Sequence, residues 1–263
     1  MEHPDFKNPV FGPIHSRRLG SSLGINLMPA TRKVCNFNCI YCECGWNPSP
    51  EHDKKGPKPY MPTPGEVAAA LEEKLRDLAE KGKAPDVITF SGNGEPTLHP
   101  EFLRIVGDTV RIRNRWSPGT KVCVLSNAGT LHMPGVVEGL LQADQRIMKV
   151  DSAFETTLRI INRPGDGYSL SQTITQLKRF EGNFTLQTLF LSGHIEGKPV
   201  DNTTDEELEA WFSLVDELRP CQVMVYTLDR QTPAPGLKKC PVEKLEAIAG
   251  ALRVKGYDVV VAG

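Results

Sequence analysis

The residues most suited to chemistry are four cysteines that lie within ten positions, in the stretch VCNFNCIYCECGW (34–46). Cys35, Cys39 and Cys42 are spaced C-x3-C-x2-C, and Cys44 follows two residues later. Three thiolates on one tight loop can hold one face of a [4Fe–4S] cube and leave one iron without a protein ligand. Ferredoxin-type electron carriers use a fourth cysteine, because they need a closed redox centre. The spacing is compatible with both arrangements, depending on whether Cys44 is a ligand.

Zinc is the rival metal for clustered thiols. Structural zinc usually binds two separated pairs of ligands, whereas the remaining cysteines, Cys123, Cys221 and Cys240, are isolated in the sequence. Cys123 and Cys221 lie in or beside predicted strands, and we expect both to be buried among apolar residues. The odd total of seven cysteines also argues against a disulfide framework. The sequence therefore favours an iron–sulfur site over a zinc site.

Composition and charge are those of an ordinary globular protein, with 39% hydrophobic residues, 24% charged residues and a formal net charge of -1. This charge gives no strong field toward nucleic acid or an anionic membrane, although a local basic patch is compatible with it. No apolar run has the length of a membrane-spanning helix, and the start, MEHPDFKNPVFGP, lacks the features of a secretory signal. We therefore expect a cytoplasmic protein with no membrane partner, whose thiols are reduced.

After the cysteine cluster, the chain alternates between helix and strand patterns. The segment 63–82 begins with a capping box at Thr63 and Glu66, and its apolar residues fall on one helical face. The run 86–90 is short, apolar and β-rich, as in a buried parallel strand. The same reasoning predicts further helices at 100–112, 134–141, 169–180, 203–218 and 241–256, and further strands at 21–29, 121–125, 146–150, 184–191, 222–228 and 257–261.

This pattern runs without a low-complexity linker, so we predict one domain over residues 1–263. It would have a cysteine loop at 29–47 and a C-terminal helix and short strand at 241–263. Repeated βα units with right-handed crossovers give a parallel sheet with outer helices, either a closed or partial barrel or an open doubly wound sheet. In both, chemistry gathers at the carboxyl ends of the strands. Polar, glycine-rich segments follow the predicted strands, which indicates a common site there.

The motif CNFNCIYC resembles the C-x3-C-x-aromatic-C signature of the radical S-adenosylmethionine (radical SAM) superfamily. The stretch SGNGEPTLHP (91–100) resembles the Gly-Gly-Glu segment after the second strand in that superfamily. Three further stretches, SRRLGSSLGINLMP, INRPGDGYSLSQTI and YTLDRQTPAPGL, resemble a subgroup that includes the tRNA wybutosine-synthesis enzyme. The resemblance runs from about Gly12 to Gly256. It implies an α/β fold with a partial parallel (β/α)6 TIM-like barrel, and as cofactors a [4Fe–4S] cluster and S-adenosyl-L-methionine.

The resemblance also implies an oxidoreductase-type activity. One electron from the cluster would cleave S-adenosylmethionine, and the 5′-deoxyadenosyl radical would take a hydrogen atom from a tRNA base, a small molecule or a peptide. An electron donor of the flavodoxin or ferredoxin type would be a partner. A glycyl-radical-enzyme activating protein is one alternative. The alternative from another class is a non-catalytic iron–sulfur electron carrier or zinc protein with Cys44 as fourth ligand.

The resemblance assigns two groups of site residues. The cluster ligands would be Cys35, Cys39 and Cys42. The cofactor-binding residues would be Tyr41 near the adenine; Gly92, Asn93, Gly94 and Glu95 at the methionine end; Ser126 and Asn127 at the methionine carboxylate or the ribose; Lys149 at the methionine carboxylate; and Asp151 at a ribose hydroxyl. For Lys149 and Asp151, an internal ion pair in a filled barrel is the alternative.

Two residues depart from the superfamily pattern. Asn93 replaces a glycine, which adds a polar contact or shapes the turn. Cys44 is additional, and we expect it not to ligate the cluster, because a fourth protein ligand would block the open iron.

Two groups of arginines invite a binding interpretation. Arg111, Arg113 and Arg115 lie at the end of a predicted helix, where we expect them to face solvent and to complement the helix dipole. Arg17 and Arg18 precede the first predicted strand, and they either bind a phosphate or carboxylate or form ordinary surface charge.

Overall fold

The computed structural model describes residues 8–16, 19–49 and 59–263. Arg17 and Arg18, with their predicted anion contact, lie outside the described residues. The chain divides into two compact units, and each is described by itself. The first contains the described residues of Met1–Cys35, Asn47–Ser126 and His132–Arg146, and the second contains Asn36–Trp46, Asn127–Leu131 and Ile147–Gly263. The assignment of 1–263 to one domain stays a prediction.

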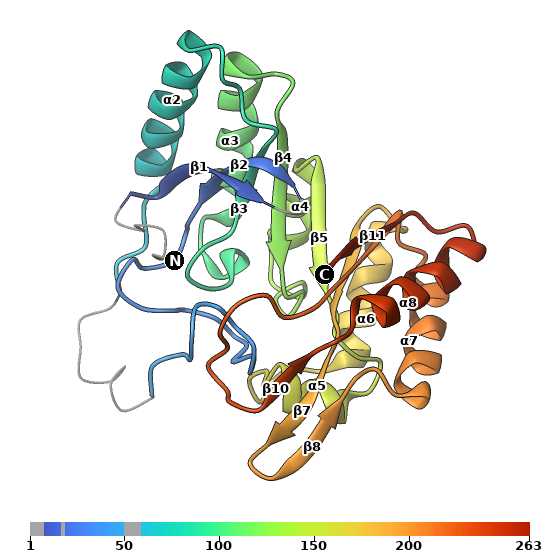
Figure 1. Cartoon of the computed structure of the whole chain (residues 1–263). Helices are drawn as coiled ribbons and strands as arrows, with labels where there is room; N and C mark the ends of the chain where they lie inside the picture. Colours follow the sequence, from blue (N-terminus) through green and yellow to red (C-terminus); the bar gives the residue numbers. More distant parts are fainter. Residues whose placement is uncertain (1–7, 17–18, 50–58) are drawn as a thin grey trace. The chain divides into compact units, whose positions relative to one another are not determined.

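The sheet of the first unit follows chain order (Figure 1). Strand β1 (Val10–Ser16) pairs antiparallel with β2 (Gly20–Ile25), and β2, β3 (Val87–Phe90) and β4 (Lys121–Ser126) run parallel. The helices of this unit are α2 (Pro64–Glu80), α3 (Phe102–Trp116) and α4 (Val136–Gln142), with a 3-10 helix η1 (Pro96–Leu98). All residues of β3 are buried, as expected of a parallel strand that is covered on both faces.

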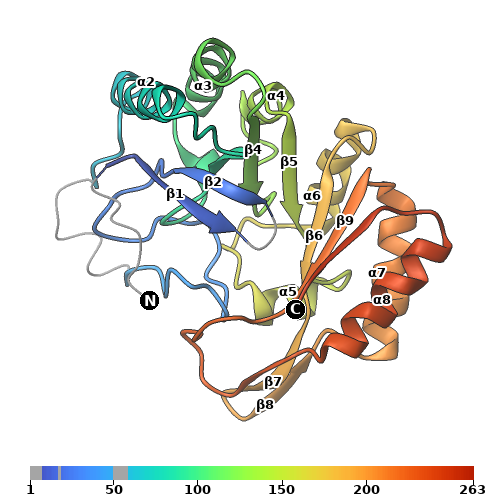
Figure 2. The same ribbon diagram turned by 45° about the horizontal axis from the view of Figure 1, so that its top comes forward.

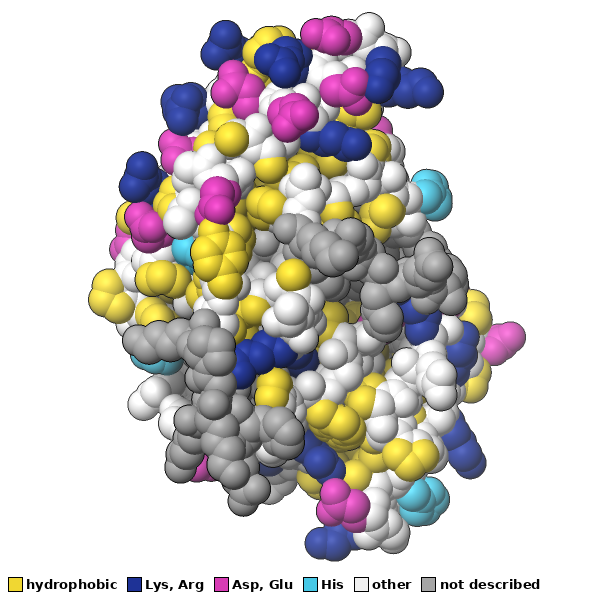
Figure 3. Space-filling model, turned by 90° about the vertical axis from the view of Figure 1, so that its left-hand side faces the viewer, with side chains coloured by type: hydrophobic (Ala, Val, Ile, Leu, Met, Phe, Trp, Pro, Cys, Tyr) yellow, Lys and Arg dark blue, Asp and Glu magenta, His cyan; other side chains and the backbone are white. Residues whose placement is uncertain are grey.

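Helix α2 shows why these local patterns fold as predicted. Thr63 Oγ1 accepts a hydrogen bond from Glu66 N, and Glu66 Oε2 accepts one from Thr63 N at 2.7 Å, which is the predicted capping box. The predicted apolar face is buried, at Val67, Leu71, Leu75 and Leu78. In the upper part of Figure 3, where α2 lies, exposed Lys and Arg side chains are mixed with Asp and Glu.

The second unit contains a parallel sheet and a smaller antiparallel sheet. In the first, β5 (Gln145–Lys149), β6 (Thr185–Leu189), β9 (Gln222–Tyr226) and β11 (Val259–Ala262) are neighbours in that order. In the second, β7 (Leu191–Ile195) lies between β8 (Lys198–Asp201) and β10 (Leu237–Lys239). The helices are α5 (Glu155–Ile161), α6 (Leu170–Leu177), α7 (Asp205–Leu218) and α8 (Val242–Val254), with a 3-10 helix η2 (Lys178–Phe180).

Helices α7 and α8 lie side by side along the parallel sheet of this unit (Figure 2). Trp211 of α7 is fully buried, and its Nε1 donates to Thr188 Oγ1 of β6 at 3.0 Å, which fixes the helix on the strand. Within the described part of the chain, no helix is both long and apolar enough to cross a membrane.

The predicted alternation of strands and helices is present, with shifted bounds and some additions. The predicted strand 184–191 is divided between β6 and β7. Strand β1, helix α5 and the β7–β8 hairpin were not predicted. The hairpin turns at Glu196 and Gly197, whose φ angles of 52° and 77° are those favoured in tight hairpin turns. The sequence interpretation had treated this segment as a polar loop.

Two burial predictions are wrong. Cys221 is exposed, unlike the buried Cys123, because it precedes β9 at the turn that follows α7. Arg113 is only 7% exposed rather than facing solvent. Its guanidinium donates to the Thr120 carbonyl and to Asp144 Oδ2, the latter at 2.6 Å, so it ties the end of α3 to the loop before β4.

Candidate functional site

The cysteine loop of the second unit is built from successive turns. Cys42 N donates to Cys39 O at 3.2 Å, and Gly45 N donates to Cys42 O at 2.9 Å. Cys39 is buried, Cys42 and Cys44 are half-buried, and none of the three is in a disulfide. Burial raises the pKa of the Cys39 thiol, so this side chain is protonated at neutral pH in the absence of a metal.

The end of helix α5 fixes this loop. Asn38 N donates to Asn162 O at 3.0 Å, and Ile40 N donates to Ile161 O at 2.9 Å. Further along, Gly165 N donates to Asn36 O at 3.0 Å. The backbone on both sides of Cys39 is therefore held by the segment that follows α5.

Asn162 also reaches the loop with its side chain. Its Nδ2 lies 3.4 Å from Cys39 Sγ, 2.8 Å from Tyr41 Oη and 2.6 Å from Asp151 Oδ2. The residue is 1% exposed. No role was predicted for Asn162. The only sequence signal for a role of Asn162 was its place in INRPGDGY. This stretch resembles the radical SAM subgroup, but no role was assigned to its residues.

Asp151 accepts hydrogen bonds from three groups of the protein. Tyr41 Oη and Asn162 Nδ2 both donate to Oδ2, and Leu189 N donates to Oδ1 at 2.8 Å. The Asp151 side chain is 0% exposed. Burial and the nearby Asp151 charge raise the pKa of Tyr41 well above its ordinary value, so Tyr41 is a donor here. The contact of Asp151 with a ribose hydroxyl stays a prediction, and it would require one of these bonds to open.

Lys149 lies beside this carboxylate at the end of β5. Its Nζ is 3.8 Å from Asp151 Oδ1 and donates to Tyr226 Oη. The ammonium also lies over two aromatic rings, 4.8 Å from the centroid of Tyr41 and 4.6 Å from that of Tyr226. Burial alone would lower the pKa of Lys149, but the Asp151 charge raises it above its ordinary value, so Lys149 is a cation. The second unit thus brings Tyr41, Lys149 and Asp151 together.

Asn127 holds the loop from another side. Its Nδ2 donates to Asn36 Oδ1 at 2.8 Å, and its Oδ1 accepts from Gly129 N at 2.9 Å. A Cβ on Gly129 would lie 2.5 Å from Asn36 Nδ2 and 2.8 Å from the Phe37 ring, so the segment after β4 packs closely on the cysteine loop. The predicted cofactor contact of Asn127 stays a prediction.

In the first unit, the turn after β3 pairs with the residue that precedes Cys35. Val34 N donates to Asn93 O, and Glu95 N donates to Val34 O, both at 3.1 Å. Gly94 has φ 142°, and a Cβ there would lie 1.8 Å from Val34 O, so the close approach requires glycine. Asn93 Nδ2 donates to Pro29 O at 3.0 Å, which ties the turn to the segment of the first unit that precedes Cys35.

The remaining predicted residues of the first unit have identifiable places. Glu95 is buried and caps η1 through Thr97, whose N and Oγ1 lie 3.2 and 2.5 Å from Glu95 Oε1. Gly92 precedes Asn93, and a Cβ there would lie 2.4 Å from Asn26 Oδ1. Ser126 is buried at the end of β4. The Cys35 carbonyl accepts from Asn47 Nδ2 at 2.9 Å. The first unit therefore contains Cys35 and the turn assigned to the methionine end.

The donor set fits an iron–sulfur cluster by its chemistry. Three thiols at positions 35, 39 and 42 share one loop and form no disulfide, and soft thiolates are the ligands that such clusters use. Across residues 8–16, 19–49 and 59–263, no three His, Cys, Asp or Glu side chains are already gathered as a metal site. The fit therefore rests on the identity and spacing of the thiols.

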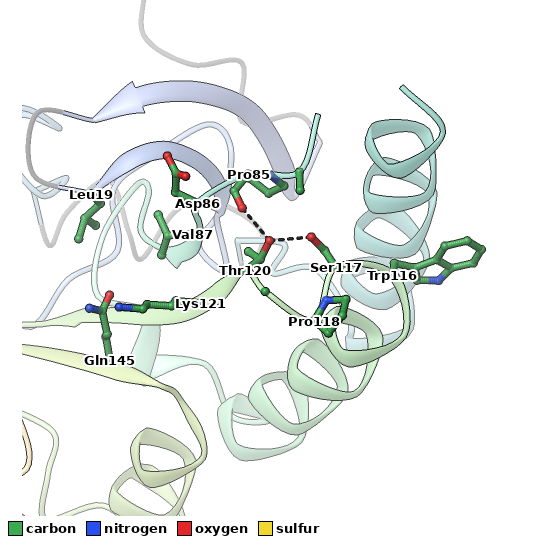
Figure 4. Close-up of a pocket in the computed structure, with 12 residues that line it drawn as sticks. Leu19, Pro85, Asp86, Val87, Trp116, Ser117, Pro118, Thr120, Lys121 and Gln145 are labelled. Carbon is green, nitrogen blue, oxygen red and sulfur yellow. Dashed lines mark hydrogen bonds between the residues drawn. The ribbon is translucent and has the colours of Figure 1, made fainter. Parts of the chain in front are cut away.

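The first unit also contains a hollow of about 770 Å³ (Figure 4). It is lined at the amino ends of strands, by Val87 of β3 and Lys121 of β4, and by Trp116 at the end of α3. None of the residues predicted to bind the cluster or the cofactor lines it. The amino ends of strands in such sheets ordinarily serve stability rather than chemistry.

Sequence comparison identifies several similar proteins. The radical SAM superfamily profile matches residues 31–201. The UPF0026 protein slr1464 of Synechocystis sp. is 33% identical over 231 residues, which cover 85% of this chain and 77% of that protein. A Brachyspira hyodysenteriae protein named GTPase Obg is 30% identical over 241 residues, which cover 90% of this chain but 32% of that protein. This chain thus spans less than half of the Brachyspira protein.

Solved structures share the fold at low sequence identity. A radical SAM methyltransferase from Sphaerobacter thermophilus has a TM-score of 0.62 and 18% identity, covering 92% of this chain and 65% of that chain. TYW1 with a lysine-pyruvate adduct bound has a TM-score of 0.60 and 15% identity, covering 89% and 73%. The predicted fold class, an α/β partial parallel barrel, is confirmed.

Proposed function

Because this chain belongs to the radical SAM superfamily and to the UPF0026 protein family, and is thus an enzyme of radical SAM type, we propose that it cleaves S-adenosylmethionine reductively. It would use a [4Fe–4S] cluster held by Cys35, Cys39 and Cys42. The substrate would lose a hydrogen atom to the radical so formed. An electron donor of the flavodoxin or ferredoxin type would supply the electron.

One observation carries the proposal. The profile match at 31–201 contains the complete C-x3-C-x2-C motif, and two of its thiols lie in a loop that the protein already holds in place. When bound, the cluster and S-adenosylmethionine would supply one-electron cleavage of a sulfur–carbon bond, giving methionine and a 5′-deoxyadenosyl radical.

The chain's own residues would hold and orient the cofactor. The turn Gly92–Glu95 would approach the methionine end with its backbone, since its glycines leave room for close contact. The Lys149 ammonium, a half-buried cation, would attract the methionine carboxylate. Tyr41 would present its ring near the adenine while its hydroxyl stays bonded to Asp151.

Anaerobic reconstitution tests the proposal. The purified chain is loaded with iron and sulfide, reduced with dithionite, and assayed with S-adenosylmethionine for 5′-deoxyadenosine and methionine. We expect both products from the wild type and from Cys221→Ala, which removes an exposed thiol outside the loop. Cys35→Ala should form neither product. A wild-type protein that binds the cluster but never cleaves S-adenosylmethionine would overturn the proposal.

Cys44 carries the alternative of a closed site. It is half-buried on the same loop as Cys42, where a fourth thiolate would make a non-catalytic electron carrier or a zinc protein. Cys44→Ala separates the two functions. Normal iron content and S-adenosylmethionine binding in this variant would exclude the closed site, whereas loss of the cluster would favour it.

The substrate class is a separate question. The sequence resemblance to the subgroup that includes the tRNA wybutosine-synthesis enzyme favours a tRNA base, while the net charge of -1 gives that choice no electrostatic support. Binding of tRNA to the reconstituted protein at low and high salt tests it. Affinity that falls steeply with salt would support a nucleic-acid substrate, and absence of binding at low salt would favour a peptide, a small molecule or a glycyl-radical enzyme.

A further inference from the structure

Asn162 contacts a predicted cluster ligand but belongs to none of the motifs assigned to the cofactor. Its backbone carbonyl accepts from Asn38 N, and the preceding carbonyl, of Ile161, accepts from Ile40 N. These bonds fix the main chain on both sides of Cys39 relative to the end of α5. The Asn162 side chain therefore meets the Cys39 sulfur from a fixed position, 3.4 Å from Nδ2 to Sγ.

The surrounding groups determine which end of the Asn162 amide is the donor. A carboxylate only accepts hydrogen bonds, so the amide nitrogen must face Asp151 Oδ2, at 2.6 Å. Tyr41 Oη is bonded to that same oxygen, so one N–H of Asn162 faces the Tyr41–Asp151 pair. The amide has a second N–H, and Cys39 Sγ is the remaining acceptor within reach.

The other end of the amide supports this orientation. Asn162 Oδ1 is buried and has no hydrogen-bond partner among the described residues. An unpartnered buried acceptor destabilises the folded state. The contacts of this amide are therefore made by its nitrogen end, which donates to Asp151 with one N–H and to the sulfur with the other.

We propose that Asn162 is a positioning residue that donates a hydrogen bond to the cluster-bound thiolate of Cys39 and thereby raises the reduction potential of the cluster. This inference rests on the proposed function. A hydrogen bond to a ligand sulfur stabilises the more negative, reduced state, and such bonds are among the protein's means of setting cluster potentials. The same amide touches Tyr41 and Asp151, so the residue joins the cluster ligand to the predicted cofactor side of the site.

An EPR-monitored redox titration of the reconstituted protein, without S-adenosylmethionine, tests the proposal. Asn162→Leu removes the donor and keeps the branched shape of the side chain. At a fixed applied potential, we expect the ratio of reduced to oxidised cluster to fall about tenfold, which equals about 59 mV for a one-electron couple. Tyr41→Phe is the matched control, because it removes a hydrogen bond of the same network without touching the sulfur. Its ratio should stay at the wild-type value.

Each outcome decides the question. An unchanged ratio in Asn162→Leu with full iron content would overturn the proposal, as would an equal fall in Tyr41→Phe. If Asn162→Leu does not assemble the cluster, the smaller Asn162→Ser gives the same measurement. Failure of both to assemble, while Tyr41→Phe assembles, would assign Asn162 a structural role only and would also overturn the proposal. Failure of the proposed function is distinct, since it appears in the wild type as absent cluster or absent cleavage.

Discussion

Replacement of Asp151 by asparagine tests whether this carboxylate organises the site from inside the protein. The carboxylate accepts from Tyr41 Oη, from Asn162 Nδ2 and from Leu189 N, and Lys149 Nζ lies 3.8 Å from Oδ1. Asparagine keeps the volume, but it turns an NH2 group toward donors and leaves the ammonium without its counter-charge. Removing one partner of a buried ion pair costs about 3–5 kcal/mol. We expect about 3 kcal/mol, because Lys149 keeps the Tyr226 hydroxyl and two aromatic faces.

Urea unfolding of the metal-free protein measures this loss, with Lys149→Met and the double variant completing a cycle. Since the second substitution removes the charge that the first leaves unpaired, the double variant should lose about 2 kcal/mol less than the sum of the single losses. The iron content of reconstituted Asp151→Asn gives an independent readout of whether the Cys39 loop keeps its arrangement.

A different pattern would refute the reasoning. If Asp151→Asn lost less than about 1 kcal/mol and the double variant were additive, the carboxylate would not be a buried organising charge. A stable Asp151→Asn protein with weakened S-adenosylmethionine binding in equilibrium dialysis would instead support the ribose contact predicted from the sequence.

Three further predictions concern the first unit. His99 accepts from Glu101 N through Nδ1 and bonds the Pro62 carbonyl through Nε2, and burial lowers its pKa below 6.5, so the unfolded state takes up the proton first. The contribution of the neutral His99 side chain to stability is therefore complete above about pH 6.5 and is lost as the pH falls below this value. Between pH 7 and the acid range, the urea midpoint of unfolding should fall more in the wild type than in His99→Gln. Arg113→Met should lower the free energy of unfolding by about 2 kcal/mol, because it leaves the Thr120 carbonyl without its donor. Arg111 is exposed, so Arg111→Met should have little effect. Equal losses of stability in the two variants would contradict the role of the buried Arg113 guanidinium. Gly94→Ala should reduce iron uptake, because its Cβ would displace Val34, while Gly119→Ala, with open space around it, should bind iron normally, and equal uptake in both would refute the packing argument.

Elements with a repeating local signal could be predicted from the sequence. The capping box at Thr63 and the apolar face of α2 depend on residues three or four positions apart, so the segment contains its own evidence. The short helix α5 has too few turns for a clear period, and strand β1 is interrupted by Gly12 and Pro13. Helix α5 is held by residues far away in the chain, such as Ile40, whereas β1 pairs with the adjacent strand β2, so for β1 the interruption alone hides the pattern.

The parts of the candidate site that could be predicted are those in which the spacing of residues in the sequence itself indicates their chemistry. Cys39 and Cys42 belong to a motif. Lys149 and Asp151 lie two positions apart at the end of a predicted strand, where alternate residues share a side. The tertiary bonds between them were not predictable. Asn162 lies 123 positions from Cys39, and Arg113 lies 31 positions from Asp144, so neither contact has a local signal.

The hydrogen bonds between the cysteine loop and the segment at the end of α5 also bear on whether the loop folds before or after the metal binds. Fixing the backbone of one residue costs about 1–2 kcal/mol of conformational entropy, so holding the five residues 36–40 costs about 5–10 kcal/mol. The bonds from Asn36, Asn38 and Ile40 to the 161–165 segment meet that cost during folding. Iron and sulfide would then arrive at a loop that is already ordered, and loss of the cluster would leave it ordered. The protein without a cluster should therefore show slow hydrogen exchange at the Asn38 and Ile40 amides. A loop that is ordered in this way can lose its cluster and bind a new one without unfolding.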